Sequence, residues 1–186
     1  MKNIKSYLIT DPNYFSDNKE IFKEKLIAVL KNHKIDFACF RDKSSKNIEE
    51  LAKIFLQICK EFKIKNILIN SNISLAIKLG FDGVHLNSQQ FDKIENAKKS
   101  KLITIISCHN LEELEKAMNK NIDFVTYSPI FDTPNKGQSK GVDKLNEVIE
   151  KFPNLKIFAL GGIIQNEQIK EIEKTKAYGF ASIRYF

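Results

Sequence analysis

The sequence predicts a (β/α)8 barrel, the TIM barrel, in which eight parallel strands close into a cylinder covered by helices. Short runs rich in β-branched and aromatic residues alternate with longer amphipathic runs throughout the 186 residues, which is the pattern of strand–helix units and a parallel sheet. Eight strand candidates can be counted, whereas open doubly wound sheets more commonly have about five or six. Because domains typically contain about 100–200 residues, we expect residues 1–186 to form a single TIM-barrel domain.

The strand candidates are short and mostly too apolar for a sheet that faces water on one side. Taken in order along the chain, they are 4–10 (IKSYLIT), 36–40 (DFACF), 65–70 (KNILIN), 82–86 (DGVHL), 102–107 (LITIIS), 123–127 (DFVTY), 156–160 (KIFAL) and 179–183 (GFASI).

Seven helices are predicted between these strands, because apolar residues recur at three- and four-residue spacings there. They are expected at 19–31, 47–62, 73–79, 90–99, 111–120, 142–151 and 165–174, with Asn47 and Asn110 as capping residues. The sequence ends at Phe186, directly after the eighth strand. We therefore expect the eighth outer helix to be missing, with a homodimer contact or a shifted first helix covering the barrel wall.

Composition excludes several classes of function. The net charge is +7, yet only two arginines occur and the lysines are scattered, so no nucleic-acid partner is expected. No apolar run approaches the ~18 residues of a membrane span, and the start lacks a signal-peptide pattern. A cytoplasmic protein with no membrane partner is predicted. The three cysteines, at positions 39, 59 and 108, are expected to be free thiols in the core.

Polar residues follow the predicted strands, where barrels of this class place their active sites. The pair Gly161-Gly162 precedes the last predicted helix and favours a phosphate site at a helix N-terminus, with a simple tight turn as the alternative. Arg41 and Lys43 suit an anionic group, unless Arg41 merely pairs with Asp42. His109 is the best candidate general acid or base, unless it only packs at a helix start.

These residues resemble the thiamine phosphate synthases and their paralogues the thiazole tautomerases, a TenI-like family, along essentially the whole chain. The markers are YLITD, FRDK, DGVHL, SCHNLEE, SPIFDTPNKG and ALGGI, in the family's order. The resemblance implies a barrel enzyme of thiamine biosynthesis that binds a phosphorylated small molecule. In the synthase, a pyrimidine diphosphate and a thiazole phosphate are joined with the help of Mg²⁺; the tautomerase uses no metal.

The resemblance also implies roles for individual positions. A diphosphate would be held by Arg41, Lys43 and in part Asn70, and the loop that closes on the substrates contains Thr133 and Lys136. The thiazole phosphate would bind at Gly161 and Gly162, with Arg184 replacing a phosphate-contacting serine of the family, and Ser107 would lie near the reacting groups.

Two departures from the family concern the metal. The magnesium-binding aspartates of the synthases correspond to Ser71 and Gln90 here, so no metal ligand is predicted and Mg²⁺ is expected only if synthase activity is retained. We therefore expect a divergent enzyme that binds thiazole phosphate and moves a proton through His109, as a tautomerase does. Two alternatives stay open: a thiamine phosphate synthase, which is a transferase, and a non-catalytic ligand-binding or regulatory paralogue.

Overall fold

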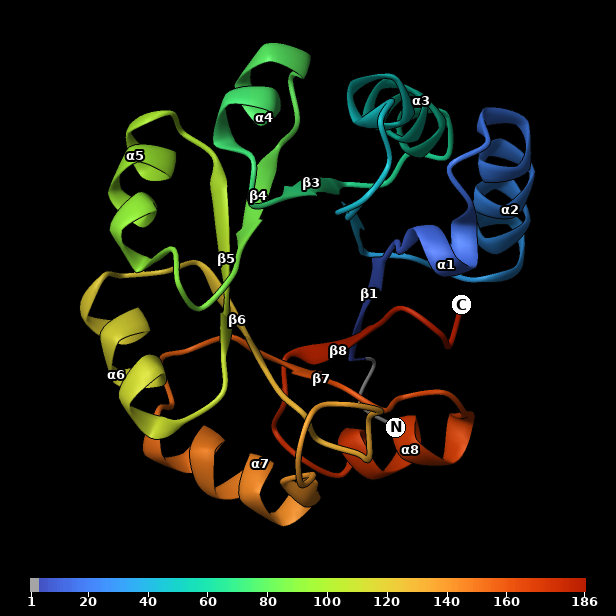
Figure 1. The fold of residues 1–186 in the computed structure, drawn as a ribbon. Helices are drawn as coiled ribbons and strands as arrows, with labels where there is room; N and C mark the ends of the chain where they lie inside the picture. The colour runs from blue at the N-terminus through green and yellow to red at the C-terminus, as the bar shows by residue number, and fades with distance from the viewer. Residues whose placement is uncertain (1–3) are drawn as a thin grey trace.

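A computed structural model describes residues 4–186, and its eight strands form one closed parallel barrel in sequence order (Figure 1). Each strand pairs with the next one along the chain, and β1 pairs with β8 to close the cylinder. The predicted (β/α)8 barrel is confirmed. Its strands are β1 (Lys5–Ile9), β2 (Phe37–Phe40), β3 (Asn66–Asn70), β4 (Gly83–Leu86), β5 (Ile103–Cys108), β6 (Phe124–Tyr127), β7 (Ile157–Leu160) and β8 (Gly179–Ser182).

Helices surround the strands on the outside of the barrel (Figure 1). They are α2 (Lys19–Asn32), α3 (Ile48–Glu61), α4 (Ile73–Leu79), α5 (Ile94–Lys99), α6 (Leu111–Asn119), α7 (Gly141–Lys151) and α8 (Asn166–Glu173). The predicted cap at Asn110 is confirmed, since its side chain accepts the N–H of Glu113 at 2.8 Å. Asn47 occupies the predicted N-cap position of α3, but its side chain makes no capping bond, and its amide donates to the Asp17 carbonyl at 3.3 Å.

Two helical segments differ from the prediction. A short helix, α1 (Pro12–Phe15), follows β1, because Asp11 caps it and a proline occupies its first turn. The predicted helix at 90–99 is split into a 3₁₀ turn, η1 (Phe91–Lys93), and α5. The N–H of Lys93 bonds to the carbonyl of Gln90 three residues earlier, at 3.0 Å, and this tighter bond shortens the α-helix.

No helix follows β8 within residues 4–186, and aromatic packing takes its place. The rings of Tyr185 and Phe186 lie 5.7 and 5.5 Å from the imidazole of His33, at the end of α2. Phe186 also stacks on Phe180 of β8 at 5.8 Å. The last residues of the chain therefore cover part of the wall between β8 and α2.

The core has two parts, one between strands and helices and one inside the barrel. Inside, aromatic rings gather near the first residues of the strands, where Phe37, Phe124, Phe158 and Tyr178 pack with centroids 5.2 to 6.3 Å apart. This packing fills the N-terminal end of the barrel. Polar side chains are left to the C-terminal end, where the candidate site lies.

Two further observations concern the cysteines and the possibility of membrane-spanning helices. The three cysteines are free and buried, as the sequence predicted. Among the described residues, helices that combine the length and the apolar character needed to cross a membrane are absent.

Candidate functional site

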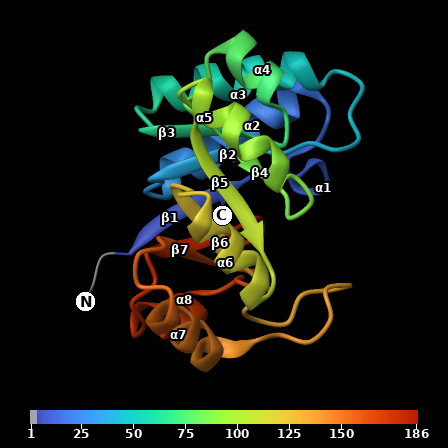
Figure 2. The same ribbon diagram turned by 90° about the vertical axis from the view of Figure 1, so that its left-hand side faces the viewer.

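The predicted site residues lie at the C-terminal ends of the strands. Arg41 and Lys43 follow β2, Asn70 ends β3, Ser107 lies in β5, and His109 follows it. The remaining predicted positions follow β6, β7 and β8 and comprise Thr133, Lys136, Gly161, Gly162 and Arg184. Figure 2 shows the segment between β6 and α7 projecting from the barrel on the side of α1, away from the N-terminus. The fold thus places all of these residues at one end of the barrel.

Gly161 and Gly162 form a turn in which any larger residue would be strained. Their φ angles are 99° and 70°, a region that side chains rarely adopt. A Cβ on Gly161 would lie 2.8 Å from Pro129 Cα, and one on Gly162 would lie 2.6 Å from backbone atoms of Phe131 and Asp132. The turn is therefore packed directly against the loop that follows β6.

Backbone N–H groups of this turn are available to a ligand. Within residues 4–186, the N–H groups of Gly162 and Ile163 donate to no other group, although both residues are buried. Gln168 of α8 holds the turn: it accepts the N–H of Ile164 at 2.7 Å and donates to the Gly162 carbonyl at 2.7 Å. Free N–H groups ahead of a helix suit an anion such as phosphate.

Ser182 supports the same turn from β8. Its buried hydroxyl donates to the Ile163 carbonyl at 2.7 Å and accepts the N–H of Arg184 at 3.1 Å. Arg184 is half-buried, and none of the ion pairs among residues 4–186 involves it. The positive charge of Arg184 thus belongs to a residue two positions after Ser182, whose side chain contacts the glycine turn.

The loop after β6 reaches the turn through Thr133. The hydroxyl of Thr133 donates to the Phe131 carbonyl at 3.0 Å, and the N–H of Phe131 donates to the Gly161 carbonyl at 3.0 Å. Lys136 is exposed farther along this loop. Thr133 and the glycines are thus brought together, whereas Lys136 stays in solvent.

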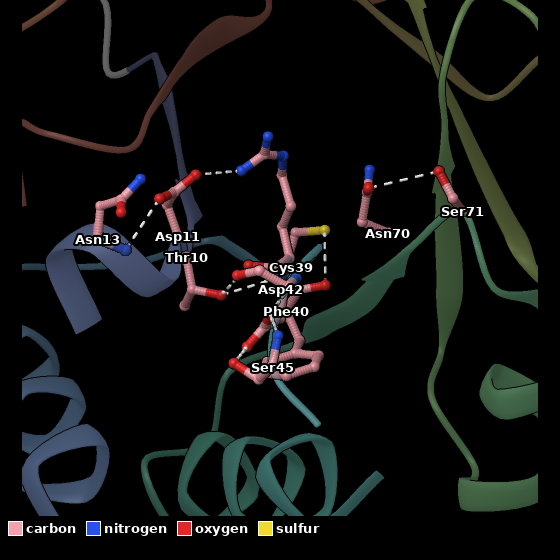
Figure 3. Close-up of polar contacts among 11 residues, drawn as sticks. Thr10, Asp11, Asn13, Cys39, Phe40, Asp42, Ser45, Asn70 and Ser71 are labelled. Atoms are coloured by element: carbon pink, nitrogen blue, oxygen red, sulfur yellow. Dashed lines mark hydrogen bonds and ion pairs between the residues drawn. The ribbon is translucent and has the colours of Figure 1, made fainter. Parts of the chain in front are cut away.

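Arg41 forms an ion pair with Asp11 (Figure 3), which is the N-cap of α1. Thr10 holds the Arg41 backbone, since its hydroxyl accepts the Arg41 N–H at 2.9 Å. The proposed pair of Arg41 with Asp42 is wrong: Asp42 accepts N–H groups of Ser44 and Ser45 at 3.0 and 2.9 Å. Lys43 is exposed and forms no ion pair with other residues in 4–186.

Asn70 joins β3 to β4. Its amide donates to the His85 carbonyl at 2.9 Å, and the N–H of Ser71 donates to the same oxygen at 2.9 Å. Figure 3 shows Asn70 and Ser71 to the right of the Asp11 and Cys39 side chains. The side chain of Asn70 is therefore committed to the backbone of the neighbouring strand.

Ser71 and Gln90 lie together, joined by neutral hydrogen bonds. Gln90 is buried, its Nε2 donates to the Ser71 carbonyl at 3.3 Å, and its Oε1 accepts the Asn87 N–H at 3.1 Å. The amide of Asn87 lies 3.4 Å from the Ser71 hydroxyl. Ser71 and Gln90 are therefore in direct contact.

This donor set does not fit Mg²⁺. The ion prefers carboxylate and phosphate oxygens, whereas the side chains of Ser71, Asn87 and Gln90 are neutral and already hydrogen-bonded to one another or to backbone. Within residues 4–186, no cluster of three or more His, Cys, Asp and Glu side chains is arranged to hold a metal. The side chains of Ser71, Asn87 and Gln90 therefore do not form a ligand set suited to Mg²⁺.

His109 is exposed at the barrel mouth and contacts β6. Its Nδ1 lies 3.2 Å from the Ser128 carbonyl and 3.1 Å from the Ser128 hydroxyl. No hydrogen bond from its Nε2 to residues 4–186 is present. One ring nitrogen is therefore anchored, and the other can face a bound ligand.

A chain of polar contacts crosses the interior behind Ser107. His85, on β4, lies 2.9 Å through Nδ1 from the Tyr7 hydroxyl and 3.0 Å through Nε2 from the Ser107 hydroxyl. Burial lowers the pKa of His85 to about 3, helped by the positive charge of Arg41. His85 is thus an interior barrel residue that contacts a predicted site residue.

Sequence reasoning overlooked three contributors to this region. They are Asp11, which pairs with Arg41, Tyr7, which contacts His85, and Ser182, which contacts the glycine turn. For His85 a signal existed, because it is a polar side chain within an otherwise apolar strand. For Asp11 and Ser182 the contacts join distant segments that only the closed barrel brings together.

The fold and the site define a (β/α)8-barrel protein whose polar mouth includes a glycine turn suited to an anion. The chain belongs to the thiamine monophosphate synthase family, whose family model matches residues 6–186.

Curated relatives and a solved structure agree with this assignment. An Aquifex aeolicus protein, provisionally named thiamine-phosphate synthase 2, is 36% identical over 185 residues, covering 97% of this chain and 96% of the relative. Thiamine-phosphate synthase 1 of Streptococcus pneumoniae strain R6 is 31% identical over 154 residues, covering 77% and 72%. A thiamine phosphate pyrophosphorylase from Pyrococcus furiosus superposes with a TM-score of 0.82 at 25% identity, covering 97% and 85%.

Proposed function

We propose that this protein binds a thiazole phosphate and acts as a thiazole tautomerase that transfers a proton without a metal. The proposal rests chiefly on one observation: the pair Ser71 and Gln90 forms a neutral, hydrogen-bonded cluster where the family's synthases would hold Mg²⁺. The glycine turn and the histidine at the mouth of the barrel are retained. The proposed reaction therefore needs only a general acid–base residue and a site that binds the phosphate.

The phosphate is proposed to bind at the turn of Gly161 and Gly162. The available N–H groups of Gly162 and Ile163 would donate to its oxygens, as helix N-termini do in other phosphate sites. The half-buried Arg184 would add a positive charge. Thr133, which touches the turn, and Lys136 would come from the loop above it.

The proton transfer is assigned to His109. Aromatisation of the thiazole carboxylate phosphate tautomer removes a proton from a ring carbon and returns one to a carbon outside the ring of the same molecule, so no leaving group or oxidant is needed. Histidine exchanges protons near neutral pH, and Ser128 anchors Nδ1 so that Nε2 can face the ring. Ser107, two residues earlier near the end of β5, would hydrogen-bond the substrate.

A thermal-shift panel tests this proposal, because a ligand that binds the folded state raises its stability. Thiazole phosphate should raise the melting temperature in the presence of a chelator. Any shift in melting temperature caused by pyrimidine diphosphate should be the same with the chelator as with added Mg²⁺. A stabilisation by thiazole phosphate that requires Mg²⁺ would contradict the proposal.

The second candidate function is thiamine phosphate synthesis. The names of the Aquifex and Streptococcus relatives favour it, as does the retention of Arg41, Lys43 and Asn70 at the mouth. Any Mg²⁺ would then have to be carried by the diphosphate itself. Incubation of both substrates with millimolar Mg²⁺ separates the candidates: turnover to thiamine phosphate supports the synthase, and its absence beside tautomerase activity supports the first proposal.

We also propose that the chain works as a single domain in the cytoplasm on a phosphorylated small molecule, without nucleic-acid or membrane partners. A homodimer formed over the wall near β8 is part of the same proposal, and sedimentation of the purified protein tests it. Ligand binding without turnover in either assay would instead indicate a regulatory paralogue.

A further inference from the structure

The contacts of Tyr7, His85 and Ser107 join the barrel interior to its mouth. Tyr7 and His85 are buried, whereas Ser107 is half-buried at the C-terminal end of β5. Thr126 of β6 closes the group, since its buried hydroxyl lies 3.4 Å from both His85 Nε2 and the Ser107 hydroxyl. Among these four residues, only Ser107 is exposed enough to contact a ligand.

The donors in this cluster can be assigned from chemistry. Burial raises the pKa of Tyr7 well above its usual value, so the phenol keeps its proton. A neutral imidazole has one N–H and one acceptor nitrogen, and the partner of one nitrogen selects the tautomer. Because a phenol is a stronger donor than acceptor, we assign the Tyr7 hydroxyl as the donor to Nδ1, which lies 2.9 Å away. The imidazole proton then resides on Nε2, where it faces Ser107.

We propose that His85 is a positioning residue: Tyr7 holds it in the Nε2–H tautomer, and it donates to Ser107 so that the serine hydroxyl points its own proton at the bound ligand. Ser107 accepts hydrogen bonds from His85 and Thr126, and its proton is left for an acceptor outside the protein. The ligand group at this point is therefore an oxygen acceptor, most simply a carboxylate.

A serine nucleophile activated by His85 is the competing interpretation, and the environment of His85 disfavours it. A base that takes the serine proton must become an imidazolium, which a carboxylate usually stabilises. Here the partner is a phenol, the imidazole is fully buried, and the positive charge of Arg41 further opposes protonation. His85 thus donates to Ser107 and does not deprotonate it.

Nitrogen NMR of the free protein tests the tautomer without any ligand. The chain has three histidines, and the His85 signals are those lost in His85→Gln. At pH 7 we expect Nε2 to appear as a protonated and Nδ1 as an unprotonated ring nitrogen. The opposite tautomer, or an imidazolium, would overturn the proposal. This measurement stands whether or not the protein is a tautomerase.

The Tyr7→Phe variant tests whether the Tyr7 hydroxyl fixes the tautomer of His85. It keeps the ring that packs on Phe37 and Phe158 and removes only the donor, so the two His85 tautomers should mix. Tyr178→Phe is the matched control, because it removes a hydroxyl from the same aromatic cluster, and it should leave the His85 signals unchanged. A Tyr7→Phe spectrum identical to that of the wild type would refute the role of Tyr7.

A binding comparison tests the ligand class and rests on the proposed function. Ser107→Ala should weaken binding of thiazole carboxylate phosphate about tenfold or more, since hydrogen bonds to charged groups are the stronger ones. Binding of thiazole phosphate, which lacks the carboxylate, should change less than twofold. Equal losses for both compounds would overturn the assignment of the acceptor, whereas failure of both to bind wild type would refute the proposed function instead.

Discussion

Arg41 pairs with Asp11, which lies 30 residues away at the end of the neighbouring strand, and not with the adjacent Asp42. The carboxylate of Asp42 is held by N–H groups of its own turn. The closed barrel brings the ends of β1 and β2 together, and Thr10 fixes the Arg41 backbone there. The positive charge available to an anion at this edge is reduced by Asp11.

Asp11→Asn should therefore strengthen the binding of inorganic diphosphate. The side chains of Asp11 and Arg41 are 14% and 24% exposed, and an ion pair of this kind contributes at most about 1 kcal/mol, so the gain should be severalfold. Isothermal titration calorimetry at low salt measures it. Asp143→Asn removes one charge from an exposed position of α7 and serves as the control. Unchanged or weaker diphosphate binding in Asp11→Asn would contradict the account of this edge.

Gly162→Ala should destabilise the fold more than another glycine substitution at positive φ. Gly80 has a φ of 78° with nothing within 4 Å of an added Cβ, so Gly80→Ala isolates backbone strain of about 1–2 kcal/mol. At Gly162 the Cβ would also meet backbone at 2.6 Å, which adds about 1–3 kcal/mol. Urea unfolding measures the free energies. Equal losses at the two positions would show that the turn can relax.

The barrel itself could be predicted from the sequence, because each strand and helix has a local signature. The eight apolar runs and the helix at Ile73–Leu79 needed no tertiary information. The helix at Pro12–Phe15 was missed since it is only one turn long. Asn47 shows the opposite limit: its sequence context suggested a cap, but its amide reaches Asp17 instead.

The sequence predicted where the site residues lie in the barrel, but not which hydrogen-bond and ion-pair partners they have. The number of strands located the mouth and hence Gly161, His109 and Arg41. The pairings that set their chemistry join residues about 20 to 80 positions apart, as Tyr7 and His85 do with a separation of 78. No short-range pattern encodes such a pair, because it arises only when strands β1 and β4 face one another across the interior.

The double variant Ser71→Asp, Gln90→Asp should acquire a metal dependence that the wild type lacks. The two positions are linked through the Ser71 carbonyl, so two carboxylates there would repel in the free protein and attract a hard cation. The melting temperature should fall without metal and recover in millimolar Mg²⁺.

The control for that experiment is Ser71→Asn, Gln90→Asn, which alters the shapes of both side chains without adding charge. It should show no recovery. An equal Mg²⁺ response of the wild type and the double aspartate variant would mean that the neutral cluster already accepts the ion.

Asp36 should make stability depend on pH in the acid range. Burial raises its pKa, but hydrogen bonds from Lys5 and Ser6 outweigh burial, and the pKa is lowered overall. A lowered carboxyl pKa in the folded state stabilises the protein above the unfolded value of about 3.9. That contribution is lost as the pH falls through the folded pKa.

Asp36→Asn should accordingly reduce stability near pH 7 by about 1 kcal/mol, the contribution of a typical hydrogen bond. The gap between variant and wild type should close as the pH falls below about 4. Urea unfolding between pH 3 and pH 7 would show this convergence. A gap of constant size would mean that the carboxylate charge is not what stabilises this contact.

The most direct test of the central claim, metal-free proton transfer by His109, is the ultraviolet change as the thiazole carboxylate phosphate tautomer aromatises in excess chelator. Wild type and His33→Gln, which alters a remote histidine at the end of α2, should both exceed the buffer rate. His109→Ala should lose about 10²- to 10⁴-fold, the usual share of a general acid–base group. A wild-type rate equal to buffer, or equal rates for wild type and His109→Ala, would contradict the claim.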